Sequence, residues 1–130
     1  MNFFETQHEW VHVTWVKEGK EFRIYRNGEL FATRSSAPEN VYTEKGSYYI
    51  GRSDKFFAGQ IAELSVWSVA RTGAEIQKDV HRHLKGDELG LAYYWPLNEG
   101  TGDPVLDKGK NANHCKIYGA TWQRVEVPIV

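Results

Sequence analysis

The sequence predicts a single all-β domain that carries one short helix. Aromatic residues make up 14% of the 130 residues, and they alternate with Val, Ile and Thr in short runs, as in strands with one buried face. The dipeptide Asn27-Gly28, which favours two positive φ angles, joins two of these runs as a tight hairpin. A chain of this length holds one hydrophobic core, so residues 1–130 are expected to form one folding unit.

The first third of the chain predicts a three-stranded meander. Residues 9–16 alternate apolar and polar side chains with a period of two, which is typical of a strand. Residues 17–20 then supply a turn, and residues 21–26 return with the same period. After the Asn27-Gly28 turn, residues 29–34 form the third strand.

The middle of the chain predicts a loop and two further strands. Residues 35–45 are polar and contain turn-forming residues, so we expect a loop there. Residues 47–52 predict a short aromatic strand, and residues 57–67 predict the longest strand of the chain.

One segment has the signals of a helix. Thr72 precedes Glu75 by three residues, which is the spacing of a capping box. Ile76, Val80 and Leu84 then recur at every fourth position and form an apolar stripe. We therefore expect one short helix over residues 72–84, packed against the strands.

The last third returns to extended structure. Residues 91–97 alternate Leu, Tyr and Trp with their neighbours and predict another strand. Residues 98–111 are rich in Gly and Asp and predict a loop, and residues 114–122 and 125–129 predict two terminal extended segments.

Composition excludes several classes of partner. The 16 Lys and Arg residues are interspersed with 17 Asp and Glu residues, so we expect no basic face and no nucleic-acid binding. No apolar run approaches the length of a membrane span, and Met1–Trp10 lacks the apolar run of a signal peptide, so we expect no membrane association. Cys115 is the only cysteine and cannot form an internal disulfide, which leaves the compartment open.

The order of five segments resembles the laminin-G-like and pentraxin-like jelly-roll domains of the concanavalin A-like family. Together these segments lie between Trp10 and Trp122 and so cover nearly the whole chain. The segments are Trp10–Val13, Ile24–Leu30, Ile50–Arg52, Gly59–Trp67 and Leu91–Gly102. The resemblance implies an antiparallel jelly-roll β-sandwich, an extracellular or cell-surface location, and a non-catalytic role in carbohydrate or protein-surface recognition and adhesion.

The resemblance also has a gap at its beginning. The family has several strands before the one that starts near Trp10, whereas only Met1–His8 precede it here. We expect either a part of a larger chain or a reduced sandwich with exposed edges, and exposed edges invite pairing with another chain. A homo-oligomer is therefore expected, with Arg124–Val130 as one participant. The alternative is that Met1–His8, which contains Phe3 and Phe4, folds back and covers the gap within one chain.

Catalysis by a protein of this fold can be tested against the carboxylates that its glycosidases use. Such enzymes place two carboxylates across one bond, about 5 Å apart in the retaining class. The corresponding strand here offers only Glu63, so we expect a binding domain and not an enzyme. A structural or assembly domain without a small ligand is the first alternative, and a glucanase-like glycosidase is the second.

A cluster of loop residues predicts the ligand site. Exposed aromatic rings beside amide, carboxylate and guanidinium groups are typical of sugar binding, because the apolar face of a sugar stacks on a ring while its hydroxyls need donors and acceptors. The predicted site residues are Asn40, Tyr42, Tyr48, Arg52, Asp54 and Phe56, with Tyr49 and Phe57 beside them. The alternative is that most of these rings pack into the sandwich.

Calcium is the one cofactor for which the sequence offers candidate ligands. Pentraxins bind calcium through an acidic run that corresponds to residues 52–54, where Arg52 here replaces an acid. A second candidate is formed by Asp107, Asn111 and Asn113, whose oxygens could surround a hard cation. Lys residues dilute the negative charge of this loop, so we expect no cofactor and favour an ordinary Asx-turn.

Overall fold

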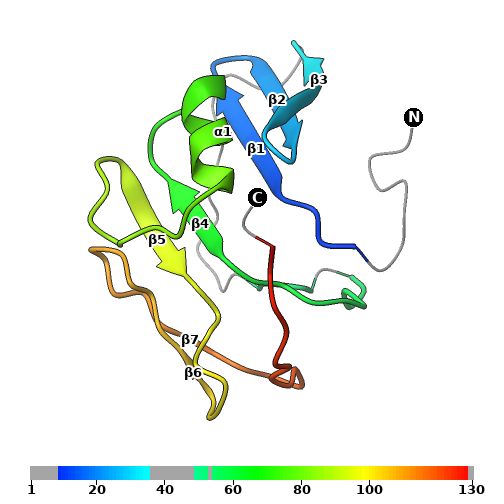
Figure 1. Ribbon diagram of the computed structural model, residues 1–130, viewed down its shortest axis with the longest axis vertical. Coiled ribbons are helices and arrows are strands. Elements are labelled where there is room, and N and C mark those ends of the chain that lie inside the picture. The colour runs from blue at the N-terminus through cyan, green and yellow to red at the C-terminus, as the bar shows by residue number, and fades with distance from the viewer. Residues whose placement is uncertain (1–8, 36–48, 53, 129–130) are drawn as a thin grey trace.

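The computed structural model describes residues 9–35, 49–52 and 54–128, and Figure 1 shows their arrangement. Within these residues the elements are seven strands in antiparallel sheets and one α-helix. The predicted fold class, an all-β domain with one short helix, is confirmed. No helix among the described residues has the length and apolar character needed to span a bilayer.

The first sheet is the predicted meander, with strand order β1-β2-β3. Strands β2 (Glu21–Arg26) and β3 (Glu29–Arg34) agree with the prediction residue for residue. Strand β1 (Val13–Glu18) starts later than predicted. The delay has a local cause, because the side chain and backbone of Asn27 hydrogen-bond to the backbone of His12 and end the ladder there.

The two faces of this sheet have different environments. Val16 and Tyr25 point to one face, where they are buried against Ile76 of the helix. Trp15 points to the other face and is 70% exposed. In Figure 1 the helix lies across β1 and β2, so it covers the face that Val16 and Tyr25 share.

Helix α1 (Gly73–Val80) begins as predicted. Thr72 is its N-cap, and the capping box with Glu75 is complete, because each side chain accepts the backbone N–H of the other residue. The predicted end at Leu84 is wrong, since the helix stops at Val80. The chain turns at His81, where the N–H groups of His81 and Arg82 bond three residues back, and the Arg82 side chain then pairs with acidic residues on either side.

The second sheet pairs β4 (Leu64–Trp67) with β5 (Leu91–Trp95). The predicted strand over residues 57–67 is therefore wrong for most of its length. Glu63 has a φ of 54°, a left-handed conformation that breaks the alternation of an extended chain. Strand β5 ends before its predicted limit because Leu97, after Pro96, also has a positive φ.

The remaining elements are short. The predicted strand over residues 47–52 is wrong in its described part, where Arg52 forms an isolated bridge to Phe56 and nothing longer. Strands β6 (Pro104–Val105) and β7 (Cys115–Lys116) form a small third sheet. Residues 125–128 form no strand, and residues 129 and 130 lie outside the described residues.

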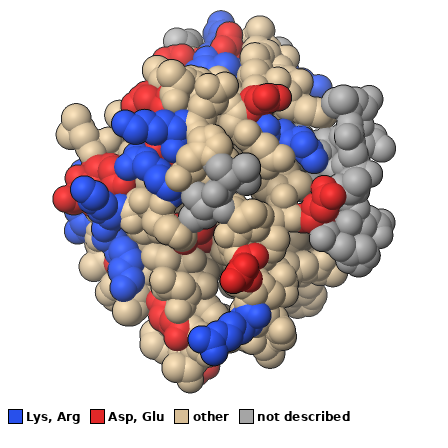
Figure 2. Space-filling view, in the orientation of Figure 1, with Lys and Arg blue, Asp and Glu red and all other residues tan. Residues whose placement is uncertain are grey.

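Charged side chains are mixed on the visible face of the molecule. In Figure 2, Lys and Arg side chains lie among Asp and Glu side chains and form no basic area of their own. The charge pattern of this face agrees with the interspersed charges of the sequence.

Candidate functional site

Three of the six residues predicted to bind ligand, Arg52, Asp54 and Phe56, lie on a narrow turn, which we call the aromatic turn and define as residues 49–52 and 54–57. Arg52 and Phe56 form an antiparallel bridge, and the Phe57 N–H donates to the Gly51 carbonyl at 2.8 Å. Gly51 has a φ of 80°, a conformation that glycine adopts without strain. The turn therefore reverses the chain tightly and presents its side chains side by side.

Arg52 is the centre of the aromatic turn. Its guanidinium carbon lies 5.0 Å from the centre of the Tyr49 ring and 5.5 Å from the centre of the Phe56 ring. Both distances are within the range of cation–π attraction. The two rings thus hold the long Arg52 side chain in place.

The aromatic turn is open to solvent. Phe56 is 79% exposed, Phe57 is 58% exposed and Tyr49 is 57% exposed, so these three rings do not pack into the sandwich. Asp54 is also exposed on the same turn. The arrangement offers ring faces for stacking, guanidinium N–H donors and a carboxylate acceptor within one short segment.

The structure brings together Arg52, Asp54 and Phe56 from the predicted ligand set, because they share the turn. The other three predicted residues, Asn40, Tyr42 and Tyr48, lie outside the described residues.

The predicted metal residues occupy a different environment, the loop that follows β6. Asp107 is only 4% exposed. One of its carboxylate oxygens accepts the N–H groups of Tyr94 and Gly109, each at 2.8 Å, and the other accepts the N–H of Asn113 at 2.8 Å. Burial by itself raises the pKa of Asp107, but these three hydrogen bonds and the nearby His114 outweigh it and hold the pKa below its usual value.

The same loop pairs with the outer edge of β5. The Lys108 N–H donates to the Tyr94 carbonyl at 2.7 Å, and the Asn111 side-chain amide donates to the Ala92 carbonyl at 2.7 Å. With the Tyr94 N–H bound to Asp107, backbone groups of β5 that would face an unpaired edge have partners. The loop thus takes the place of a neighbouring strand.

The favoured alternative for this loop is confirmed, because the bond from Gly109 to the Asp107 carboxylate is an Asx-turn. Asn113 is engaged as well, since its carbonyl accepts the indole N–H of Trp95 at 3.0 Å. Asp107, Asn111 and Asn113 therefore lie together, and each has protein partners. Across residues 9–35, 49–52 and 54–128, no three His, Cys, Asp or Glu side chains gather as a metal site. The expectation that the loop binds no calcium stays a prediction.

Glu63 has the role of a structural carboxylate. The Tyr94 hydroxyl donates to one of its oxygens at 2.6 Å, and His83 Nδ1 lies 3.0 Å from the other. Burial and the Glu63 carboxylate together raise the pKa of the Tyr94 hydroxyl well above its usual value, so the tyrosine stays a donor. These contacts tie the start of β4 to β5 and to the segment after α1.

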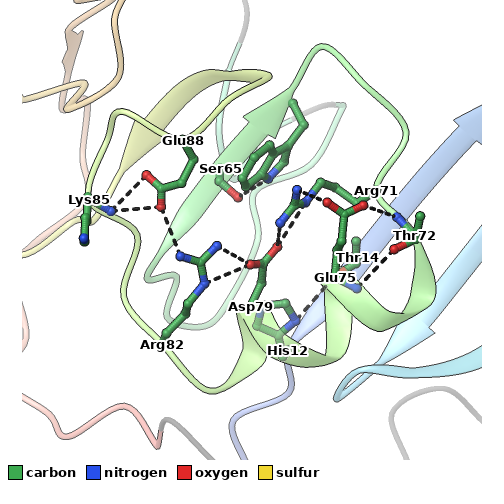
Figure 3. A network of polar contacts seen from close by, with 11 residues as sticks. His12, Thr14, Ser65, Arg71, Thr72, Glu75, Asp79, Arg82, Lys85 and Glu88 are labelled. Carbon is green, nitrogen blue, oxygen red and sulfur yellow. Dashed lines mark hydrogen bonds and ion pairs between the residues drawn. The ribbon is translucent and has the colours of Figure 1, made fainter.

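Figure 3 shows a network of ion pairs that sequence reasoning missed. The Arg71 guanidinium lies 4.0 Å from the centre of the Trp67 ring and binds Glu75 at 2.6 Å and Asp79 at 2.8 Å. The spacing of the two acids, four and eight residues after Arg71, was the available signal, because residues four apart lie on one face of a helix.

The network continues beyond the helix. Arg82 binds Asp79 at 2.7 Å and Glu88 at 3.5 Å. Near the other end of the cluster, His12 Nδ1 lies 3.5 Å from the Thr14 hydroxyl. Burial lowers the pKa of the His12 imidazole, and the negative charge of Asp79 opposes that shift. The network fixes α1 between the two larger sheets and leaves its acidic groups occupied.

Comparison with known proteins identifies the class of this domain. Residues 4–77 match a laminin-G family described as the concanavalin A-like lectin/glucanases superfamily. The match covers more than half of the 130 residues. The chain therefore belongs to this superfamily, and the resemblance and the concanavalin A-like sandwich predicted from the sequence are confirmed.

Two individual proteins are similar over most of the chain. Pappalysin-1 of Mus musculus is 30% identical over 108 residues, which are 76% of this chain and 7% of pappalysin-1. A crystal structure of a candidate carbohydrate-binding protein from Bacteroides ovatus superimposes with a TM-score of 0.66 and 26% identity. That superposition covers 82% of this chain and 33% of the Bacteroides chain. The chain thus spans a small part of each relative.

Proposed function

We propose that this domain is a non-catalytic carbohydrate-binding module and that its contact surface is the aromatic turn. The superfamily and the description of the Bacteroides relative support a binding module. The observation that carries the choice of surface is the exposed pair of rings, Tyr49 and Phe56, with Arg52 held against both.

The proposed contact uses two kinds of interaction. The apolar face of a sugar ring stacks on the exposed rings of Phe56 and Phe57, which removes apolar surface from water. Guanidinium N–H groups of Arg52 donate to hydroxyls, and the Asp54 carboxylate accepts from them. Because the rings already hold Arg52, less side-chain entropy is lost when the ligand binds.

A glycan array with and without calcium tests the proposal and identifies the sugar. On the sugars that bind, Phe56→Ala is expected to weaken affinity at least tenfold, about 1.4 kcal/mol, because it removes a stacking surface. Tyr118→Ala is the matched control, since Tyr118 is 78% exposed and Phe56 is 79% exposed. Equal affinities of the two variants, or no binding to any glycan, would overturn the proposal.

The non-catalytic part of the proposal rests on Glu63. Both of its oxygens have protein partners, so the carboxylate is committed to holding β4 and β5 together. We expect no hydrolysis of a β-glucan panel, and we expect Glu63→Gln to lower the melting temperature. Hydrolysis that disappears in this variant would contradict the proposal.

A specific observation favours a second role, self-association. Among the described residues, large apolar side chains lie open to solvent: Trp15 is 70% exposed, Leu89 is 95% exposed and Val125 is 47% exposed. Strands β1 and β3 are the edges of the first sheet, and an edge strand can pair with another chain. A second copy of the chain is therefore the proposed partner.

Light scattering at micromolar concentration tests the dimer. We expect the mass of two chains for the intact protein and the mass of one chain for Trp15→Ser or after deletion of Val125–Val130. A monomeric mass for the intact protein would overturn self-association and would leave the sugar-binding proposal unaffected.

A further inference from the structure

A polar groove separates the Asn27-Gly28 turn from α1. Its volume is about 400 Å³, which lies in the range of small-molecule sites. The groove is formed by the hairpin turn, the start of β3 and one side of the helix. Its lining residues are Asn27, Glu29, Ala74, Gln77, Lys78 and His81. In Figure 1 this part of the molecule lies well apart from residues 49–52 and 54–57.

One wall of the groove, the hairpin turn, is held by the helix and by the backbone of His12. A β-carbon at Gly28 would lie 3.3 Å from the Val80 side chain and 3.4 Å from the Gln77 α-carbon, so the turn packs directly on the helix. The Asn27 side-chain oxygen accepts the His12 N–H at 2.9 Å, and the Asn27 N–H donates to the His12 carbonyl at 2.8 Å. These contacts fix the turn before any ligand arrives, which lowers the cost of binding.

The polar side chains that line the groove are exposed, and apart from the Asn27 oxygen they have no partner among the described residues. On the other side of α1, Glu75 and Asp79 are paired with Arg71. By contrast, the side chains of Gln77, Lys78 and His81 make no hydrogen bond or ion pair with another described residue, and the same holds for Glu29. The acidic side chains on one side of the helix are therefore paired with arginine. The polar side chains on the other side face the groove and have no partner among the described residues.

The chemistry of this set selects the ligand class. Lys78 and the free amide N–H groups of Asn27 donate, Glu29 accepts, and Gln77 does both. One ammonium and one carboxylate balance each other, so an anion such as phosphate gains little here and is opposed by Glu29. The only apolar lining residue is Ala74, which disfavours a lipid or an aromatic ligand.

We infer that this groove is a second, separate binding site for a neutral, hydroxyl-rich sugar unit. Each sugar hydroxyl is both a donor and an acceptor, as the mixed lining requires. Because stacking rings are missing from the groove lining, binding is expected in the millimolar range. The inference extends the proposed function to another surface and does not depend on the aromatic turn.

An NMR titration of the intact chain tests the inference. The probes are the methyl glycosides of glucose, galactose and mannose at tens of millimolar, observed through the side-chain amides of Asn27 and Gln77. We expect at least one glycoside to shift both amides, and Gln77→Ala to weaken that binding at least fivefold, as followed by the Asn27 amide. Lys85→Ala is the control, because Lys85 is exposed and does not line the groove.

Two comparisons separate this inference from the proposed function. Phe56→Ala should weaken binding at the aromatic turn at least tenfold and leave the groove shifts unchanged. If the amides of Asn27 and Gln77 do not move with any glycoside, or move only with sulfate or glycine, the inference is overturned whatever the glycan array shows. If they move while the array is insensitive to Phe56→Ala, the inference stands and the proposed surface fails.

Discussion

The Asp107 loop and the aromatic turn differ in where their polar groups find partners. In the loop, both oxygens of a buried carboxylate accept backbone N–H groups, and the neighbouring Asn111 amide is bound to β5. In the aromatic turn, Arg52 contacts two ring faces that are themselves open to solvent. The loop uses its hydrogen-bonding groups within the fold, whereas those of the turn stay open to solvent.

Because of this difference, a substitution in the Asp107 loop should change stability, whereas a substitution in the aromatic turn should change the proposed ligand binding. A buried polar group is costly unless it is satisfied, so the partners of Asp107 are as necessary as the carboxylate itself. An exposed ring such as Phe56 contributes little to folding and can be removed without leaving a cavity. Substitutions in the two regions should therefore affect different measurements.

The largest expected effect is that of Asp107→Ala. The change leaves the N–H groups of Tyr94, Gly109 and Asn113 without their acceptor and exposes the edge of β5. We expect a loss of about 3–5 kcal/mol in the free energy of unfolding, measured by urea denaturation. Asp103→Ala is the control, because Asp103 is exposed, and it should change stability by no more than about 0.5 kcal/mol. Similar losses in both variants would show that the loop is not special.

The same carboxylate predicts how stability depends on pH. Because the folded state holds the pKa of Asp107 below its usual value, the folded state prefers the ionised form. Its contribution is fully present above the unfolded pKa, about 3.9, and is lost as the pH falls through the lower folded pKa. Asp107→Asn should therefore flatten the acid limb of a stability profile, and an unchanged limb would contradict this account.

Local signals predicted the fold where partners are close in sequence. Strands β2 and β3 have the predicted limits because Asn27-Gly28 joins them directly. The strand predicted over residues 57–67 failed because the positive φ of Glu63 is held by Tyr94 and His83, which are distant in sequence. The alternation of apolar and polar residues along a strand cannot predict contacts with residues that are distant in sequence.

The candidate sites follow the same rule. Arg52, Asp54 and Phe56 lie within five residues, so their clustering was predictable from the sequence. The role of Asp107 depends on Tyr94, which is thirteen residues away. The sequence spacing of Asp107, Asn111 and Asn113 made this loop a candidate cation site. In the tertiary structure, backbone N–H groups bind the Asp107 carboxylate instead.

A smaller effect is expected from the ion-pair network. Arg71→Ala removes one partner of Glu75 and one of Asp79 and uncovers the Trp67 ring. Because Arg71 and Asp79 are each 14% exposed, we expect a loss of about 2 kcal/mol in thermal or urea unfolding. Lys78→Ala on the same helix should cost no more than about 0.5 kcal/mol. If the two variants are equally stable, the network has no role in holding α1.

The helix cap is expected to contribute less again. Thr72→Ala removes the side chain that accepts the Glu75 N–H at the start of α1. We expect a loss of about 1 kcal/mol in urea unfolding, and Thr72→Ser should retain most of the stability because Ser caps equally well. A serine variant as unstable as the alanine variant would point to the Thr72 methyl group instead of its hydroxyl.

The smallest expected effect is that of calcium, for which we predict no change in melting temperature at millimolar concentration. A cation at Asp107 would have to displace the N–H groups of Tyr94, Gly109 and Asn113 from the carboxylate, and the fold would lose these bonds. Lys108 and Lys110 add positive charge on the same loop, which opposes a divalent ion. The measurement is sensitive, since a ligand bound only by the folded state must raise the melting temperature.

A clear rise with calcium that is absent with magnesium and disappears in Asn111→Ala would show that the loop is a cation site. It would also remove the contrast with the aromatic turn. If calcium still raises the melting temperature of Asn111→Ala, the ion would bind near residues 52–54 instead. Arg52 would then have to move away from its two rings to make room for the ion.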